Sequence, residues 1–497
     1  MSRLFLLVAC LAVTQAWFPS FYPQYCTKNV ATREIPPLST SEQAQVDSLV
    51  QLQVIVRHGA RTPYAEYSCW RNYSVVWNNC NVTDLMLASP SMTSQDRPAT
   101  WLFRKLYDGS ANYLGGNCLT GQLLSEGYTQ ENSLGVYLYN SYLNNPDSAL
   151  NLFNTSVWTD IDTDKYIYLR SDDQERTLMS AQILLHAMFN ISEEVIVPWH
   201  TGDYGLDQLY PNDQVCPKLD TVADNAYSSP DFIQENNSVS VNQLTAELND
   251  IFGKGYWDWD HVFDCLMTTV CTSNQVPDGM TQEIFNATIA QAEFTFAYLN
   301  LYNNSQYAKL AMGNTAWHIR NNIEAILNNQ SYALKFALFG GHDTTIMPLL
   351  AAILGEDWDM VWPGYASMIS IEIYNATAGG YLFRMIYNGD VLVVPGCDSG
   401  LCDLQVLLDS LAFGNEDMPC STPTSNVVVD GCDDGGDDDG LSNDDVVLVA
   451  FMSALLGGLL GAGAVVFVEK HRNKGKGSEL TVPIANSNNP VHENSKL

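Results

Sequence analysis

Three short apolar runs, each followed by a polar or glycine-rich turn, constrain the fold of this chain more than any other feature. They are Leu52–Val56, Tyr166–Leu169 and Ala333–Phe339, and each has the length of a buried strand. A helical pattern with one apolar face follows the second run over Thr177–Phe189, and another follows the third run to about Leu354. Strands that alternate with helices predict an α/β domain with a mostly parallel sheet.

Both ends of the chain carry targeting patterns. Arg3, an apolar run and small residues near Ala16 predict a signal peptide over residues 1–16. The run Val446–Val468 has 23 residues without a charge, which is long enough to span a bilayer. Basic residues follow it, so residues 469–497 are predicted to be a cytoplasmic tail. A GPI signal is the alternative, but its apolar tail normally ends the chain.

The chain is therefore predicted to be a single-pass type I membrane glycoprotein. Its main part would be lumenal or extracellular, at the cell surface or in a lysosome-like compartment, and a tail without tyrosine favours the cell surface. Nine N-x-S/T glycosylation triplets occur, at Asn72, Asn81, Asn154, Asn190, Asn236, Asn286, Asn303, Asn329 and Asn375. Twelve cysteines include Cys10 in the signal peptide, and the remaining odd number predicts at least one that is free or pairs with another chain.

Charge is distributed very unevenly. The net charge of -33 argues against nucleic acid as a partner, and only 23 lysines and arginines are present. Residues 430–445 hold eight aspartates, so residues 421–445 are predicted to form a solvated acidic stalk. A calcium-binding turn is the alternative. Residues 65–118 show no regular pattern and are predicted to be a loop-rich insertion.

The segment Arg57–Pro63, which reads RHGARTP, directly follows the first predicted strand. Ligands of open α/β sheets bind beyond the carboxyl ends of the strands. Two guanidinium groups there can hold phosphate oxygens. Their positive charge also lowers the pKa of His58 and keeps its imidazole neutral and nucleophilic. In a chain so poor in arginine, this cluster favours a phosphate site over an incidental surface group.

A second candidate segment, Gly340–Thr345, follows the third predicted strand and opens a helix. A helix N-terminus favours anions. Taken alone, Asp343 would be interpreted as a helix cap. Because it follows a strand in the same way as the first segment, it becomes a candidate acid.

These residues resemble the histidine acid phosphatases, within branch 2 of the histidine phosphatase superfamily. Arg57–Pro63 matches that family's R-H-G-x-R-x-P signature, and His342-Asp343 matches its second motif. Gly121–Leu123 and Arg170–Ala181 match further motifs, and the segment from Tyr365 to Cys402 is similar to the end of prostatic and lysosomal acid phosphatases. The resemblance covers roughly residues 50 to 420.

The resemblance implies a three-layer α/β/α sandwich of the phosphoglycerate mutase type. Residues 48–190 and 325–420 would build it, and residues 191–324 would form a mainly helical cap. It also implies disulfides Cys216–Cys420 and Cys397–Cys402. Met368 stands where relatives often have cysteine, so Cys265 is expected to pair with Cys271 instead.

The resemblance further implies hydrolysis of small phosphate monoesters without a cofactor or metal. His58 would be the nucleophile and Asp343 the proton donor, while four side chains would hold the phosphoryl oxygens: Arg57, Arg61, Arg176 and His342. A narrower phytase or lysophospholipid phosphatase is one alternative. A non-catalytic surface receptor is another, although every expected catalytic residue is present. A homodimer is left open.

Two other patterns are interpreted as unrelated to catalysis. Asp258–Val262 fits the D-x-D-x-[TV] pattern of aspartyl phosphatases, but no apolar strand precedes it, so it is predicted to lie on the cap surface. His186 lies within the helix Thr177–Phe189 and is predicted to pack there rather than to act in catalysis.

Overall fold

The computed structural model describes residues 24–64, 69–80, 86–88, 102–104, 113–189, 196–254, 257–328, 330, 333–416 and 420. These residues belong to one compact unit. The predicted signal peptide, acidic stalk, membrane span and tail lie outside the described residues, as do Asn81, Asn190 and Asn329. Within the described ranges, none of the helices has the length and apolarity needed to cross a membrane.

A central sheet has the strand order β10-β9-β8-β1-β7-β6, and β11 pairs with β9. The strands are β1 (Val46–Arg57), β6 (Ile167–Ser171), β7 (Phe336–Gly341), β8 (Met368–Ala376), β9 (Tyr381–Tyr387), β10 (Asp390–Leu392) and β11 (Leu401–Asp403). The three predicted strands are confirmed as β1, β6 and β7, which pair in parallel. The prediction of a mostly parallel sheet is wrong, because β8, β9, β10 and β11 pair antiparallel. Short turns join β8 to β9 and β9 to β10, and such turns connect only antiparallel neighbours.

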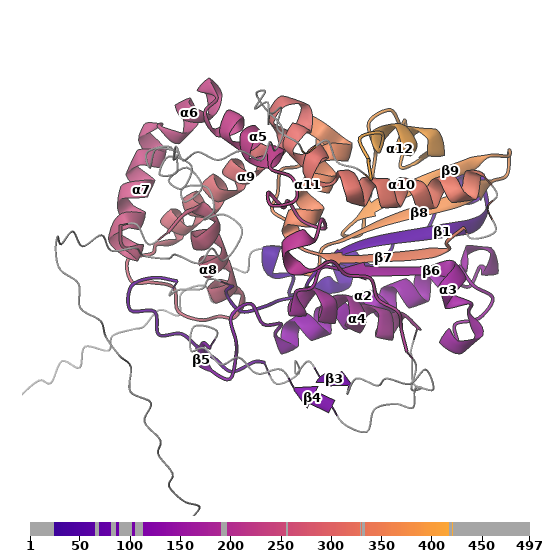
Figure 1. Cartoon of the computed structure of the whole chain (residues 1–497), viewed down its shortest axis with the longest axis horizontal. Helices are drawn as coiled ribbons and strands as arrows, with labels where there is room; N and C mark the ends of the chain where they lie inside the picture. The colour runs from indigo at the N-terminus through magenta and orange to yellow at the C-terminus, as the bar shows by residue number, and fades with distance from the viewer. Residues whose placement is uncertain are drawn as a thin grey trace, which may run out of the picture. The chain divides into compact units, whose positions relative to one another are not determined.

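Helices cover both faces of the sheet (Figure 1). On one face lie α2 (Ser125–Tyr142) and α4 (Glu175–Phe189), and on the other lie α10 (Gly313–Leu327) and α11 (Asp343–Leu354). Strand β1 serves both layers, because Val54 and Val56 share a core with α2 and α4 whereas Ile55 shares one with α11. The predicted helices over 177–189 and up to Leu354 are confirmed as α4 and α11.

Five helices lie to one side of the sheet, and we call them the cap helices (Figure 1). They are α5 (Lys218–Tyr227), α6 (Pro230–Asn236), α7 (Val239–Phe252), α8 (Trp259–Cys271) and α9 (Gln282–Ala311). Side-chain oxygens of Ser229, Ser238, Asp258 and Thr281 cap four of them. Asp258 is thus an N-cap, and His261 and Val262 behind it are buried. The prediction that Asp258–Val262 lies on the surface is wrong for its second half.

The remaining elements are short. The short α-helices are α1 (Thr40–Gln43), α3 (Thr163–Tyr166) and α12 (Leu404–Ser410), and the 3-10 helices are η1 (Gln24–Cys26), η2 (Val30–Arg33), η4 (Ser148–Leu150), η5 (Trp158–Asp160), η6 (Tyr204–Leu206) and η7 (Gly355–Asp357). Two strand pairs lie outside the central sheet: β2 (Val76–Trp77) with β5 (Gly115–Gly116), and β3 (Met86–Ala88) with β4 (Leu102–Arg104). His186 on α4 is exposed, so the prediction that it packs is wrong, and it lies on the side of the helix away from the core.

Five disulfides join the described cysteines. They are Cys26–Cys271, Cys69–Cys265, Cys80–Cys118, Cys216–Cys420 and Cys397–Cys402. The last two are the pairs that the resemblance implied. The expected Cys265–Cys271 bond is wrong, because both cysteines lie on α8 and six residues of helix separate their Cα atoms by about 9 Å. They bond instead to segments that precede the cap, and Cys432, the remaining mature cysteine, lies outside the described residues.

Candidate active site

His58 follows the last residue of β1 and lies at the carboxyl edge of the three parallel strands. Its backbone N–H donates to Gly341 O at 3.0 Å, which links β1 to the end of β7. Its imidazole is 1% exposed, and its Nδ1 lies 2.9 Å from Gly59 O. A carbonyl oxygen can only accept, so Nδ1 carries the proton and the lone pair is on Nε2. Burial and the nearby arginines lower the pKa of His58 well below its usual value. The ring is therefore neutral, as a nucleophile must be.

Arg57 is fully buried beneath this edge. Its guanidinium forms an ion pair of 2.8 Å with Asp343 and donates to the hydroxyl of Tyr25 at 2.7 Å and to Pro363 O. Its Cζ also lies 4.7 Å from the ring centroid of Tyr25 and 4.9 Å from that of Tyr365. These contacts hold one arginine between the nucleophile's strand and the predicted proton donor.

Arg61 lies against the imidazole of His58. Its Nε lies 3.4 Å from Nε2 of His58, and its Nη1 forms a buried ion pair of 2.6 Å with Asp264 of α8. The other oxygen of Asp264 accepts from the backbone N–H of Tyr64 at 2.9 Å. Asp264 thus fixes both the guanidinium and the loop that carries it.

Arg176 lies at the start of α4 and has a buried Nε without a hydrogen-bond partner. Burial and repulsion from Arg61 lower its pKa to about 10, which still leaves the guanidinium charged. Gly121 makes room for this side chain, since a Cβ at Gly121 would lie 3.3 Å from Arg176 Nη1 and the residue has a φ of +65°. The matched motif around Gly121 therefore has a structural role beside an arginine that still has donor capacity for a ligand.

His342 and Asp343 begin α11, as their motif predicted. His342 Nε2 lies 2.8 Å from Asp172, whose other oxygen accepts from Thr177. The rings of His342 and His58 are 5.5 Å apart. The carboxylate and hydroxyl fix the orientation of His342 toward the nucleophile.

Asp343 accepts a hydrogen bond of 2.7 Å from the indole of Trp362 in addition to its ion pair with Arg57. Burial alone would raise the pKa of Asp343. The charge of Arg57 and the bond from Trp362 outweigh it and lower that pKa below its usual value. The carboxylate is therefore ionised down to a lower pH than an ordinary aspartate, and a negative ligand beside it would favour its protonation.

Together these groups form one cluster of positive charge around a buried imidazole. All six predicted residues lie together at this edge: Arg57, His58, Arg61, Arg176, His342 and Asp343. A nucleophilic nitrogen lies among the guanidiniums, and a carboxyl group that can exchange a proton lies on the side of α11. Such an arrangement stabilises charge on transferring phosphoryl oxygens.

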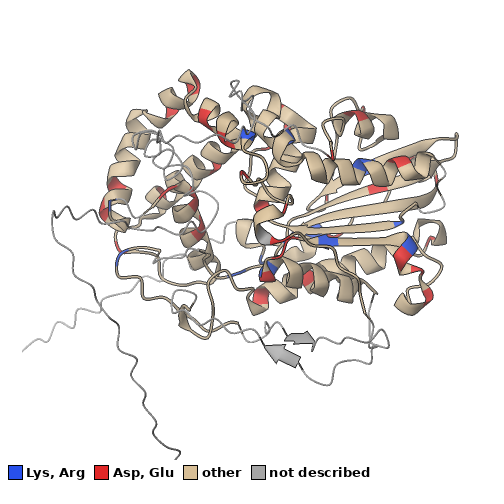
Figure 2. Ribbon diagram, viewed as in Figure 1, with Lys and Arg blue, Asp and Glu red and all other residues tan. Residues whose placement is uncertain are grey.

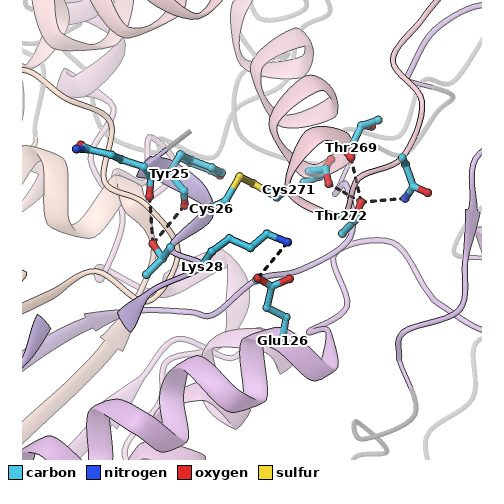
Figure 3. The surroundings of a disulfide bond; sticks show 12 residues. Tyr25, Cys26, Lys28, Glu126, Thr269, Cys271 and Thr272 are labelled. Carbon is cyan, nitrogen blue, oxygen red and sulfur yellow. Dashed lines mark hydrogen bonds and ion pairs between the residues drawn. A yellow bond between two sulfur atoms is a disulfide. The ribbon is translucent and has the colours of Figure 1, made fainter. Parts of the chain in front are cut away.

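Several supporting residues could not be predicted from the motifs. Asp264 belongs to none of the matched motifs and lies 203 residues from Arg61 in the chain. Tyr25 and Trp362 are single aromatic residues in irregular segments. Asp172 is the exception, because it lies within the matched segment Arg170–Ala181, where an acidic residue near the motif arginine was the available signal. Figure 3 shows how the Cys26–Cys271 bond brings Tyr25 and η1 against the end of α8.

Several known proteins are similar to this chain. The sequence model of the histidine phosphatase superfamily (branch 2) matches residues 48–388. Counting factor 60 of Dictyostelium discoideum is 27% identical over 81% of this chain and 94% of that protein. Human lysophosphatidic acid phosphatase type 6 is 25% identical over 78% of this chain and 89% of that protein. Among solved structures, a phytase from Klebsiella sp. ASR1 aligns with 76% of this chain and 98% of the phytase chain, with a TM-score of 0.48 and 13% sequence identity. The chain belongs to branch 2 of the histidine phosphatase superfamily and is a phosphatase.

Proposed function

We propose that this phosphatase hydrolyses phosphate monoesters through a phosphohistidine at His58, with Asp343 as the proton donor. The observation that carries the proposal is the neutral, buried His58, whose unprotonated Nε2 faces Arg61 inside a cluster of arginines. A surface receptor would have no need for an uncharged imidazole held in this tautomer.

In the first step, the lone pair of His58 Nε2 attacks phosphorus and the bond from phosphorus to the ester oxygen breaks. Asp343 gives its proton to the departing oxygen, which leaves as an alcohol. Arg57, Arg61, Arg176 and His342 hold the other phosphoryl oxygens during the transfer. Their donors are already oriented by Asp264, Asp172 and Tyr25, so little reorganisation is needed.

In the second step, the Asp343 carboxylate takes a proton from water, whose oxygen attacks phosphorus. The phosphorus–nitrogen bond breaks, inorganic phosphate forms, and His58 returns to its neutral state. The same carboxyl group thus serves as acid and then as base. Because the pKa of Asp343 is lowered despite its burial, the group is protonated mainly in acid, and an acidic pH optimum is expected. The negative charge of a phosphate ester beside it would raise the pKa of Asp343 toward the working range.

The location of the enzyme is also part of the proposal. Five disulfides are typical of an oxidising compartment. Four glycosylation triplets begin at exposed asparagines: Asn72, Asn154, Asn286 and Asn303. These features support a catalytic part outside the cell or in a lysosome-like lumen, anchored by Val446–Val468. Release of the full chain from membranes by alkaline carbonate without detergent would contradict the anchor.

The test compares the wild-type chain with His58→Ala and His186→Ala on p-nitrophenyl phosphate from pH 3 to pH 8. His186 is exposed on α4 and outside the site, so its variant controls for loss of a histidine. We expect acid-side turnover in the wild type and in His186→Ala, and its loss in His58→Ala. Rapid quenching with labelled substrate should trap an acid-labile phosphoenzyme. A folded wild type without turnover would overturn the proposal.

A further inference from the structure

Residues 200–210, which we call the 200–210 loop, connect the edge of the sheet to the candidate active site. At its start, the backbone N–H and C=O of His200 hydrogen-bond to β6 at 2.9 and 3.1 Å. At its end, the ring of Tyr210 lies 6.0 Å from the ring of His342 in an edge-to-face arrangement. The loop therefore runs from a strand to one of the side chains that the proposed mechanism uses to hold the phosphoryl oxygens.

The carboxylate of Asp207 organises this loop. Its Oδ1 accepts from the backbone N–H of Leu209 at 2.8 Å, and its Oδ2 accepts from that of Gly202 at 3.0 Å. Oδ1 also forms an ion pair of 3.0 Å with Nη2 of Arg170 on β6. Lysines and arginines are sparse along the ribbon (Figure 2), and this pair is buried, because Asp207 is 0% exposed. Water therefore cannot replace a partner that Asp207 loses.

A single hydroxyl group links the loop to the start of α11. Thr345 Oγ1 donates to Leu209 O and accepts from the backbone N–H of His342 at 3.0 Å. Thr345 is fully buried, and a Cβ at Gly341 would collide with its hydroxyl oxygen. The position of Leu209 in the loop therefore bears on the position of the His342 backbone.

His342 is thus held from two sides. Asp172, which directly follows β6, binds Nε2 of its ring. The 200–210 loop contacts its backbone through Thr345 and its ring through Tyr210. Asp172 fixes the ring alone, so the backbone that carries the ring depends on the loop.

We infer that Asp207 is a positioning residue for phosphoryl transfer, which keeps His342 in place through Leu209 and Thr345. The inference rests on the proposed function, because that function assigns His342 to the phosphoryl oxygens. Asp207 acts only through other residues of the chain. Its loss should therefore weaken phosphate binding to the extent that His342 contributes to it, and no further.

The test is a double-mutant cycle in the full chain. It measures the Kd of labelled inorganic phosphate by equilibrium dialysis and the KM for p-nitrophenyl phosphate, neither of which depends on the fraction of folded protein. Asp207→Asn keeps the size of the side chain but turns an NH₂ group toward one of its donors, and we expect it to raise both constants about three- to thirtyfold. In a His342→Ala background the same substitution should change them less than about twofold.

Thr345 supplies a second arm that does not require Asp207→Asn to fold. Thr345→Val keeps the shape of the side chain without its hydroxyl and should raise the Kd as Asp207→Asn does. Thr345→Ser retains the hydroxyl and should keep the wild-type Kd. Asp203→Asn is the matched control, because it removes a carboxylate from an exposed position in the same loop and should leave both constants unchanged.

An unchanged Kd in folded Asp207→Asn or Thr345→Val overturns the inference. An equal rise with and without His342 also overturns it, because Asp207 would then affect the fold in general rather than this histidine. Absence of any wild-type turnover on p-nitrophenyl phosphate would instead overturn the proposed function, and the Kd values for phosphate would still decide whether Asp207 positions His342.

Discussion

At the scale of single residues, the site separates the groups that react from the groups that hold them. In the proposed mechanism His58 and Asp343 exchange a phosphoryl group and a proton. Asp264, Asp172 and Trp362 bind Arg61, His342 and Asp343 in turn, and Asp264 also accepts from the backbone of Tyr64. The holding residues come from three separate segments. Substitution of a holding residue should therefore disturb the orientation of the groups around the phosphoryl site, whereas substitution of Asp343 should impair the transfer of the proton itself.

Asp343→Asn keeps the size of the side chain and removes the proton. We expect kcat to fall about 10²–10⁴-fold, with a smaller loss for p-nitrophenyl phosphate than for an alkyl phosphate, because p-nitrophenolate leaves without protonation. Steady-state assays on both esters measure this difference. Equal losses on the two esters would contradict the role of Asp343 as the proton donor.

Asp264→Asn leaves Arg61 buried and without its counter-charge. Removing one partner of a buried ion pair destabilises a protein by about 3 kcal/mol, and a displaced Arg61 should lower kcat/KM at least about tenfold. Urea unfolding and kinetics measure the two effects. Glu324→Gln is the matched control, because its pair with Arg320 is half-exposed and should contribute less than about 1 kcal/mol.

At the scale of elements, the signature loop is held by the close approach of α2. A Cβ at Gly59 would lie 2.6 Å from Gly127 O, and a Cβ at Gly127 would collide with Ala60 O. Gln130 of the same helix accepts from Ala60 N at 2.8 Å. The glycines thus allow two backbones to meet directly behind the nucleophile.

Alanine usually stabilises a helix relative to glycine, but Gly127→Ala should destabilise this protein. The added methyl group must push the loop at Ala60, so we expect a lower Tm and a loss of kcat/KM of about tenfold or more. Gly135→Ala is the control, since its Cβ would collide with Leu184 O of α4 rather than with the loop. That variant should lose stability alone. Full activity per folded molecule in Gly127→Ala would show that the loop does not depend on this contact.

The sequence predicted those strands and helices whose residues show a regular apolar pattern. Strand β1 and helices α4 and α11 were predictable because their apolar residues recur at short spacing. The antiparallel half of the sheet was not predicted, since β8 to β10 depend on turns whose pairing the apolar pattern does not reveal. The motifs named six residues that the structure brings together at one edge of the sheet, and their roles stay predictions. Asp264 could not be found because Arg61 lies 203 residues from it in the chain, and Trp362 could not be found because it is a single aromatic residue in an irregular segment.

At the scale of the whole molecule, buried carboxyl groups make stability depend on pH in both directions. The pKa values of Asp343 and Asp172 are lowered despite their burial, so their contribution to stability is lost as the pH falls through the folded-state pKa. The pKa of Glu131 is raised well above its usual value by burial, which Arg33 only partly offsets. Its contribution runs the other way, being complete in acid and lost as the pH rises.

Glu131→Gln isolates the second effect. Both carboxylate oxygens of Glu131 are buried without hydrogen-bond partners, so the folded protein keeps the proton of Glu131 to a higher pH than the unfolded chain does. We expect the variant to have a higher Tm than the wild type at pH 7 and a similar Tm near pH 4. A Tm difference independent of pH would show that Glu131 is not held in its protonated form.

Two of the five disulfides end on α8. Cys271 is bonded to Cys26 and Cys265 to Cys69, and both partners lie before α2 in the chain. A helix fastened twice in this way cannot swing aside as a lid. Its inward face is nevertheless built from individual side chains that the covalent bonds do not involve. During evolution such a face can exchange residues, and with them the preferred ester, while the nucleophile, the arginines and the backbone that positions them stay as they are.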